Sequence, residues 1–85
     1  MDIHHLVEMA NQIGNFHESL PDHIQAVKGT ASHIRRFWDP RMRRAIFEHL
    51  DTHNGEGLSP LVLEALIGHR AELAPPPRPQ PSGKP

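Results

Sequence analysis

Residues 35–44 hold the side chains of this sequence that are best suited to recognise another molecule. They include five of its nine lysines and arginines, its only tryptophan and one of its three phenylalanines. Arginine binds carboxylates and phosphates through two parallel hydrogen bonds, and arginine and tryptophan often dominate the binding energy of protein interfaces. The segment therefore predicts a partner-binding surface made of Arg35, Arg36, Phe37, Trp38, Arg41, Met42, Arg43 and Arg44. An alternative, which composition alone slightly favours, is a core tryptophan ringed by solvated arginines.

The same basic segment offers a second function, binding to nucleic acid. A helix that ends near Trp38 and another that begins at Pro40 would form a helix-turn-helix, with arginines at the start of the second helix suited to phosphate contacts. The whole chain, however, has a net charge of −1 and a pI of about 6.7, far from the basic footprint of a DNA-binding domain. A small helical DNA-binding regulator that uses Arg35–Arg44 is thus the alternative, and a protein partner with acidic pockets is preferred.

The eight histidines raise the question of a metal site, which needs several side chains that converge on one point. His49 and His53 are four residues apart beside Glu48, but His53 falls in a predicted loop, and the adjacent His4 and His5 point to different sides. The chain also has no cysteine, no glycine-rich phosphate loop after a strand and no serine in a nucleophile elbow. We therefore expect no catalytic, metal-binding or cofactor-binding residue in this chain.

Two longer helices are predicted in the first half of the chain. The first covers residues 2–19, with Asp2 as its N-cap, and ends at Leu20-Pro21 because the residue before a proline avoids helical backbone angles. The second covers residues 21–38, where Gly29 either permits a close helix contact or marks a weak point. Both have apolar residues at helical spacing that should face the core: Ile3, Leu6, Val7, Ala10, Ile13 and Phe16, then Ile24, Val27, Ala31, Ile34 and Trp38.

Two shorter helices are predicted in the second half. Asp39-Pro40 and Ser59-Pro60 each combine a capping side chain with a proline suited to the first helical turn. The third helix therefore covers residues 40–52, and the fourth runs from residue 59 to about 73. No segment alternates between apolar and polar residues as a strand would. We expect an all-α fold, a small bundle of about four helices within a domain over residues 1–73.

Residues 74–85 differ in composition from the rest. They hold six of the nine prolines, one glycine and no large apolar residue, so they cannot bury enough surface to become ordered. We expect a disordered, proline-rich tail. The remaining residues have no disulfides, and a core of this size rarely provides more than about 3–5 kcal/mol of stability. Stabilisation by a larger partner is therefore expected.

The cellular location follows from the absence of targeting signals. No apolar run approaches the ~20 residues of a membrane-spanning helix. The first residues, which include Asp2 and two histidines, do not have the form of a signal peptide. We therefore expect a cytoplasmic protein that does not contact a membrane.

Three segments of the sequence closely resemble the delta subunit of NAD-dependent formate dehydrogenase. They are Met9-Ala10-Asn11-Gln12-Ile13, then His33-Ile34-Arg35-Arg36-Phe37-Trp38-Asp39-Pro40-Arg41-Met42-Arg43, then Gly57-Leu58-Ser59-Pro60-Leu61-Val62. Their order and spacing fit the family, and the resemblance covers about residues 3–73. The run from Phe37 to Met42 is a fairly specific match, and the run from Leu58 to Val62 is a weaker one.

The resemblance implies a small accessory subunit without catalytic activity or a cofactor of its own. Its partner would be the alpha subunit of formate dehydrogenase, which holds a molybdenum or tungsten bis-pterin centre and iron–sulfur clusters. Through the alpha subunit it would associate with the beta and gamma subunits, which carry FMN and further clusters and pass electrons to NAD. Docking on the large subunit would stabilise the complex or help to assemble it. A permanent subunit and a transient assembly factor both fit the resemblance.

Overall fold

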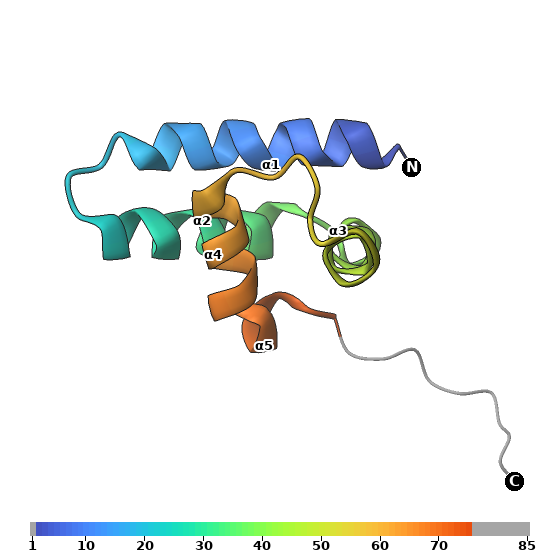
Figure 1. Ribbon diagram of the computed structural model, residues 1–85. Coiled ribbons are helices and arrows are strands. Elements are labelled where there is room, and N and C mark those ends of the chain that lie inside the picture. Colours follow the sequence, from blue (N-terminus) through green and yellow to red (C-terminus); the bar gives the residue numbers. More distant parts are fainter. Residues whose placement is uncertain (1, 76–85) are drawn as a thin grey trace, which may run out of the picture.

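The computed structural model describes residues 2–75 and contains five α-helices in that range (Figure 1). They are α1 (Ile3–Glu18), α2 (His23–Phe37), α3 (Pro40–His53), α4 (Pro60–Gly68) and α5 (Arg70–Leu73). No strand occurs in the described part of the chain, and the predicted all-α fold is confirmed. Of the predicted tail, Ala74 packs against the core, and residues 76–85 lie outside the described residues. Between residues 2 and 75, no helix is long and apolar enough to cross a membrane.

Side-chain caps fix where the helices begin. As predicted, Asp2, Asp39 and Ser59 each accept a hydrogen bond from a backbone N–H in the turn that follows. The second helix begins at His23, two residues later than predicted, because Asp22 acts as its N-cap and not as part of its first turn. The helix starts are therefore set locally, by a short polar side chain at each one.

The predicted fourth helix is divided into α4 and α5. His69 lies between them with φ −116° and ψ 24°, outside the helical region. Gly68, which has a low helix propensity, is the last residue of α4 and favours the break at this point. The change of direction allows Leu73 of α5 to reach the core, where it is fully buried. Residues 2–75 thus form five helices rather than the expected four.

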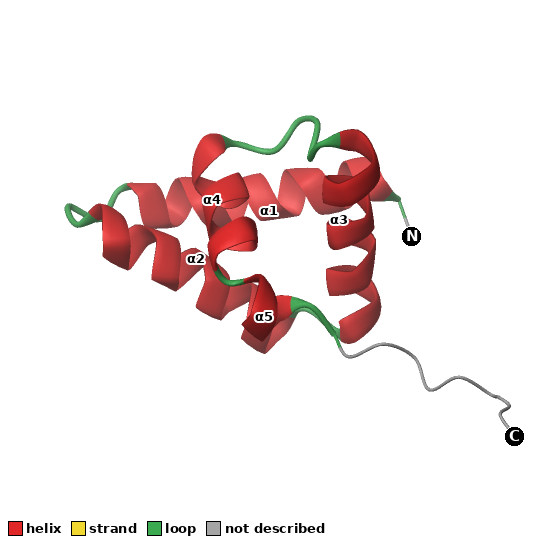
Figure 2. Cartoon of the chain, turned by 60° about the horizontal axis from the view of Figure 1, so that its bottom comes forward, coloured by secondary structure: helices red, strands yellow, loops and turns green. Residues whose placement is uncertain are grey.

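The helices are arranged around an antiparallel pair formed by α1 and α2. α4 packs against both members of this pair, and α3 crosses the end of the pair where α1 begins (Figures 1 and 2). The core lies between these helices and includes most of the apolar positions predicted from helical spacing. Its buried members include Leu6, Ala10, Val27, Ala31, Ile34, Trp38, Ile46, Phe47, Val62, Ala65, Leu66 and Leu73.

Two residues predicted to face the core are exposed instead. Phe16 is 73% exposed and Ile24 is 61% exposed. Both lie near the turn between α1 and α2, which projects beyond α4 (Figure 1). α4 crosses the α1–α2 pair instead of running along it, so it covers the middle of the pair and leaves this end open (Figure 1). The prediction for Phe16 and Ile24 was wrong because helical spacing does not reveal where, or in which direction, a neighbouring helix crosses.

Two arginines connect α3 to α5. Arg70 donates two hydrogen bonds to the carboxylate of Asp51, at 2.9 and 2.6 Å, and its guanidinium lies 4.9 Å from the centre of the Phe47 ring. Arg43 donates a hydrogen bond of 2.9 Å to the backbone carbonyl of Leu73. α3 also packs against α1, so these contacts tie the end of the described chain back to its beginning.

The loop between α3 and α4 is held by a side chain of α1. The amide nitrogen of Asn11 donates to the carbonyl of Gly57, and its amide oxygen accepts from the N–H of Ser59, each at 2.9 Å. Gly57 has φ +89°, a conformation that side chains rarely adopt. Two of the three segments that resemble the delta subunit are therefore joined by direct hydrogen bonds.

Candidate partner-binding surface

The eight predicted partner-binding residues occupy three different environments. Phe37, Trp38 and Met42 line an apolar groove. Arg43 is half-buried and bonded to the end of α5. The ion pairs among residues 2–75 do not involve the remaining arginines, which are Arg35, Arg36, Arg41 and Arg44. The structure thus separates an apolar part, a structural part and a charged part of the predicted surface.

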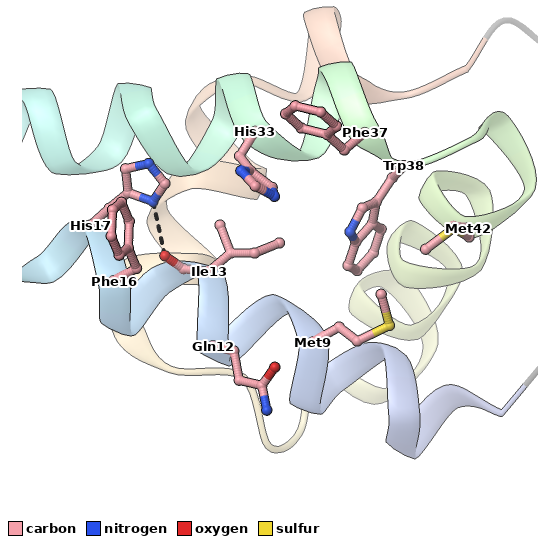
Figure 3. Close-up of a pocket in the computed structure, with 9 residues that line it drawn as sticks. All are labelled: Met9, Gln12, Ile13, Phe16, His17, His33, Phe37, Trp38 and Met42. Carbon is pink, nitrogen blue, oxygen red and sulfur yellow. Dashed lines mark hydrogen bonds between the residues drawn. The ribbon is translucent and has the colours of Figure 1, made fainter.

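The apolar groove lies between α1 and α2 and reaches the first turn of α3 (Figure 3). Its volume is about 500 Å³, and no residue of α4 lines it. It is lined by Met9, Gln12, Ile13, Phe16, His17, His33, Phe37, Trp38 and Met42. Phe16 on α1 and Phe37 on α2 are largely exposed at its edges, the latter by 68%. Contiguous exposed apolar surface of this kind marks binding sites on soluble domains.

Trp38 belongs to the core and also borders the groove. It is only 4% exposed and packs in the main apolar cluster. Trp38 is therefore a core residue, as one of the two interpretations of the sequence proposed. The nitrogen of its indole ring nevertheless points into the groove (Figure 3). A buried tryptophan usually has an acceptor for this N–H, yet no hydrogen bond within residues 2–75 involves it, and it is not among the buried polar atoms that lack a partner, so it reaches solvent through the groove. One polar atom of a core residue is therefore presented to whatever enters the groove.

Two histidines form the polar part of the groove wall. The rings of Phe16, His17, His33 and Phe37 lie in a row, with centres 5.1, 6.2 and 4.7 Å apart in that order. His17 Nδ1 lies 2.9 Å from the carbonyl oxygen of Ile13, so this nitrogen carries the proton and donates. The row spans both helices and gives the groove an aromatic edge with polar atoms between apolar rings.

The unpaired arginines lie at different distances from the groove. The guanidinium of Arg36 lies 6.0 Å from the centre of the Phe37 ring, which places it at the edge of the groove. Arg41 is exposed in the first turn of α3, next to Met42. Arg35 instead lines a separate cavity of about 260 Å³ near the α4–α5 junction. Arg36 is therefore the arginine that a contact places beside the groove, whereas Arg41 is near it by its position next to Met42 in the sequence.

The sequence did not point to the contribution of α1. Met9, Ile13 and Phe16 line the groove, although Ile13 and Phe16 were expected in the core. They form a second apolar row on α1, beside a buried row that consists of Leu6, Ala10 and Gly14. Two parallel rows are more than one neighbouring helix can cover. The width of the apolar face of α1 could therefore have indicated an exposed apolar row.

The histidines near the end of α3 have structural contacts. The rings of His49 and His53 are 5.6 Å apart, and His49 Nε2 donates to the backbone carbonyl of Glu56 at 2.7 Å. In the part of the chain that the structure describes, no three His, Asp or Glu side chains converge closely enough to hold a metal ion. The apolar, aromatic groove is by contrast suited to non-covalent recognition of another chain.

One protein family matches this chain. Its model, described as the NADH-dependent formate dehydrogenase delta subunit FdsD, matches residues 5–66. This range contains every residue that lines the groove, together with Arg36 and Arg41. No curated protein and no solved structure matches the chain significantly.

Proposed function

The chain belongs to the family of NADH-dependent formate dehydrogenase delta subunits, and from this premise we propose that it is a non-catalytic accessory subunit of a formate dehydrogenase complex. It docks on the large alpha subunit and is linked through it to the beta and gamma subunits. By docking it stabilises the complex or helps to assemble it, in the cytoplasm. The molybdenum or tungsten bis-pterin centre, the iron–sulfur clusters and FMN belong to the other subunits.

The observation that carries this proposal is the positive charge at the edge of an exposed apolar groove. Arg36 and Arg41 have no ionic partner within residues 2–75, and Phe37, which lies beside Arg36, is largely exposed. Arginine and aromatic side chains are enriched among the residues that dominate protein interfaces. A partner with carboxylates and apolar side chains would satisfy both features at once.

The composition of the chain supports an accessory role. The chain has no cysteine, the residue that holds iron–sulfur clusters in proteins. Its titratable side chains are mostly exposed or engaged in helix and loop contacts, as His49 is with Glu56. A small helical domain of this kind contributes surface rather than reactive groups.

A protein partner is favoured over DNA by two observations. The family match is to a subunit of an enzyme complex. In addition, Arg43, which a recognition helix would use to contact phosphate, is bonded to the carbonyl of Leu73. With Arg35 turned toward the α4–α5 junction as well, the basic segment does not form one continuous phosphate-binding surface.

Purification of the complex through a tagged alpha subunit tests the proposal. The amount of this chain relative to the alpha subunit is measured by quantitative mass spectrometry, in the mature enzyme and in cofactor-free precursors. Equal amounts in the mature enzyme would identify a permanent subunit, and association with precursors alone would identify an assembly factor. Absence from both, with unchanged yield and formate oxidation after deletion of the chain, would contradict the proposal.

A further inference from the structure

The groove between α1 and α2 exposes apolar surface that the fold itself does not use. Phe16 and Phe37 extend from the two helices with most of their surface in contact with solvent. Met9 and Ile13 are half-buried between the helices. A volume of about 500 Å³ lies within the usual range of protein binding pockets, and it can hold one or two large side chains. The groove therefore has the size and lining of a receptor for apolar side chains.

The groove also offers a hydrogen-bond donor without an acceptor. The indole N–H of Trp38 points into it, although the rest of the ring is buried (Figure 3). An apolar occupant alone would seal this donor away from water and leave it unsatisfied, which is unfavourable. The occupant must therefore supply an oxygen acceptor, from a carboxylate or a backbone carbonyl, next to its apolar side chain.

Positive charge restricts the occupant further. Arg36 lies beside the Phe37 ring, and Arg41 precedes the groove residue Met42 in the first turn of α3. Neither arginine has an ionic partner among the described residues. Carboxylates on the occupant would complement them, and lysines or arginines would be repelled.

We propose that the groove receives an acidic, apolar segment of the alpha subunit. This segment places a leucine- or phenylalanine-sized side chain against Ile13 and Trp38, an oxygen acceptor at Trp38 Nε1, and carboxylates beside Arg36 and Arg41. The inference rests on the proposed function, which names the alpha subunit as partner, and adds the place and chemistry of the contact. The flexible thioethers of Met9 and Met42 allow the groove to adapt to its occupant.

The affinity of the full chain for the purified alpha subunit tests this inference. Phe16→Ala with Phe37→Ala removes both exposed rings of the groove, and we expect binding to weaken by about tenfold or more. Ile67→Ala is the matched control, because Ile67 is 63% exposed on α4, outside the groove, and we expect a change of less than about twofold. All three side chains are exposed, so the helix content should remain that of the wild type.

The single tryptophan provides a second measurement that needs no substitution. In ¹⁵N-labelled chain the indole N–H gives one resonance, since Trp38 is the only tryptophan. On addition of unlabelled alpha subunit, a new hydrogen bond should move the indole proton resonance downfield. At the same concentration of alpha subunit, the resonance of the Phe16→Ala, Phe37→Ala variant should move less than that of the wild type.

Three outcomes would overturn the inference. If the wild-type chain binds but the double variant binds equally well, or the indole resonance does not move, the groove is not the contact, and the proposed function stands. A homodimer of the isolated chain that the double variant converts to monomer would assign the groove to a second copy. If the wild-type chain does not bind the alpha subunit at all, the proposed function fails together with the inference.

Discussion

Gly14 of α1 lies so close to Val62 of α4 that a methyl group on its Cα would come within 2.7 Å of Val62 Cγ2. Val62 is fully buried in the core, so other side chains surround it. The approach of α4 to the α1–α2 pair therefore depends on the missing side chain of Gly14. The groove lies between α1 and α2, and no residue of α4 lines it.

Replacement of Gly14 tests this contact. Gly14→Ala should destabilise the fold by about 1–3 kcal/mol through overpacking, although alanine has a helix propensity about 1 kcal/mol better than that of glycine. Gly68→Ala is the matched control: no atom lies within 4 Å of its added methyl group, and the fold should become slightly more stable. Urea unfolding of both variants provides the measurement. Similar changes in unfolding free energy in the two variants would show that Val62 of α4 does not pack closely against Gly14.

Gly29 permits the close contact that the sequence left as one of two possibilities. A methyl group on Gly29 would lie 2.4 Å from Cδ2 of the His17 ring. To make room, the ring would have to leave its hydrogen bond with Ile13. We therefore expect the change in unfolding free energy caused by Gly29→Ala to be at least about 1 kcal/mol more stabilising in a His17→Ala background than in the wild type. A double-mutant cycle measures this coupling, and a value near zero would argue against the contact.

Arg43 should stabilise the fold itself. Arg43→Met keeps the apolar stem and removes the hydrogen bond to Leu73, and we expect a loss of about 1–3 kcal/mol in unfolding free energy. Arg41→Met is the control on the same helix, since Arg41 is exposed, and its effect should stay within about 0.5 kcal/mol. Equal effects in thermal unfolding would refute a structural role for Arg43. Docking experiments should therefore leave Arg43 intact.

The contact between Asp51 and Arg70 should make stability depend on pH. The hydrogen bond from Arg70 lowers the pKa of the Asp51 carboxyl below its ordinary value of 3.8. The pair therefore stabilises the fold above that value, and the contribution is lost as the pH falls through the lowered pKa. Asp51→Asn should slightly lower the melting temperature at neutral pH, because the pair is exposed, and the difference should vanish in strong acid. A difference that persists in strong acid would contradict this assignment.

Local signals allowed most of the helix boundaries to be predicted. Asp39 and Ser59 cap the helices that follow them because a short polar side chain before a proline acts within one turn. Gly68 favours the break at His69 locally, but the turn of the chain there also depends on the burial of Leu73 in a core built by distant residues. Local chemistry sets where helices start, and tertiary packing sets where some of them end.

The partner-binding surface could be predicted only in part. The cluster of Phe37, Trp38 and Met42 is contiguous in sequence, and the structure places all three at the groove. The other wall consists of Met9 and Ile13, whose spacing equally fits a core position. Which row of α1 is covered depends on where α2, α3 and α4 pack against it, and helical periodicity carries no information about their positions.

Charge reversal at the edge of the groove tests the central claim, that this chain docks on the large subunit through this surface. Arg36→Glu places a negative charge in the last turn of α2, and Arg41→Glu places one in the first turn of α3. The helix dipole disfavours the first change and favours the second by similar amounts, about 0.3–1 kcal/mol each, so the double variant should fold normally. Lys28→Glu is the control for reversal of an exposed charge elsewhere on α2.

The decisive measurement is the affinity of the Arg36→Glu, Arg41→Glu variant for the alpha subunit across a range of salt concentrations. We expect binding about tenfold or more weaker than that of the wild type at low salt, a smaller difference at high salt, and a change of less than about twofold for Lys28→Glu. Wild-type affinity of the double variant at every salt concentration would contradict docking through Arg36 and Arg41.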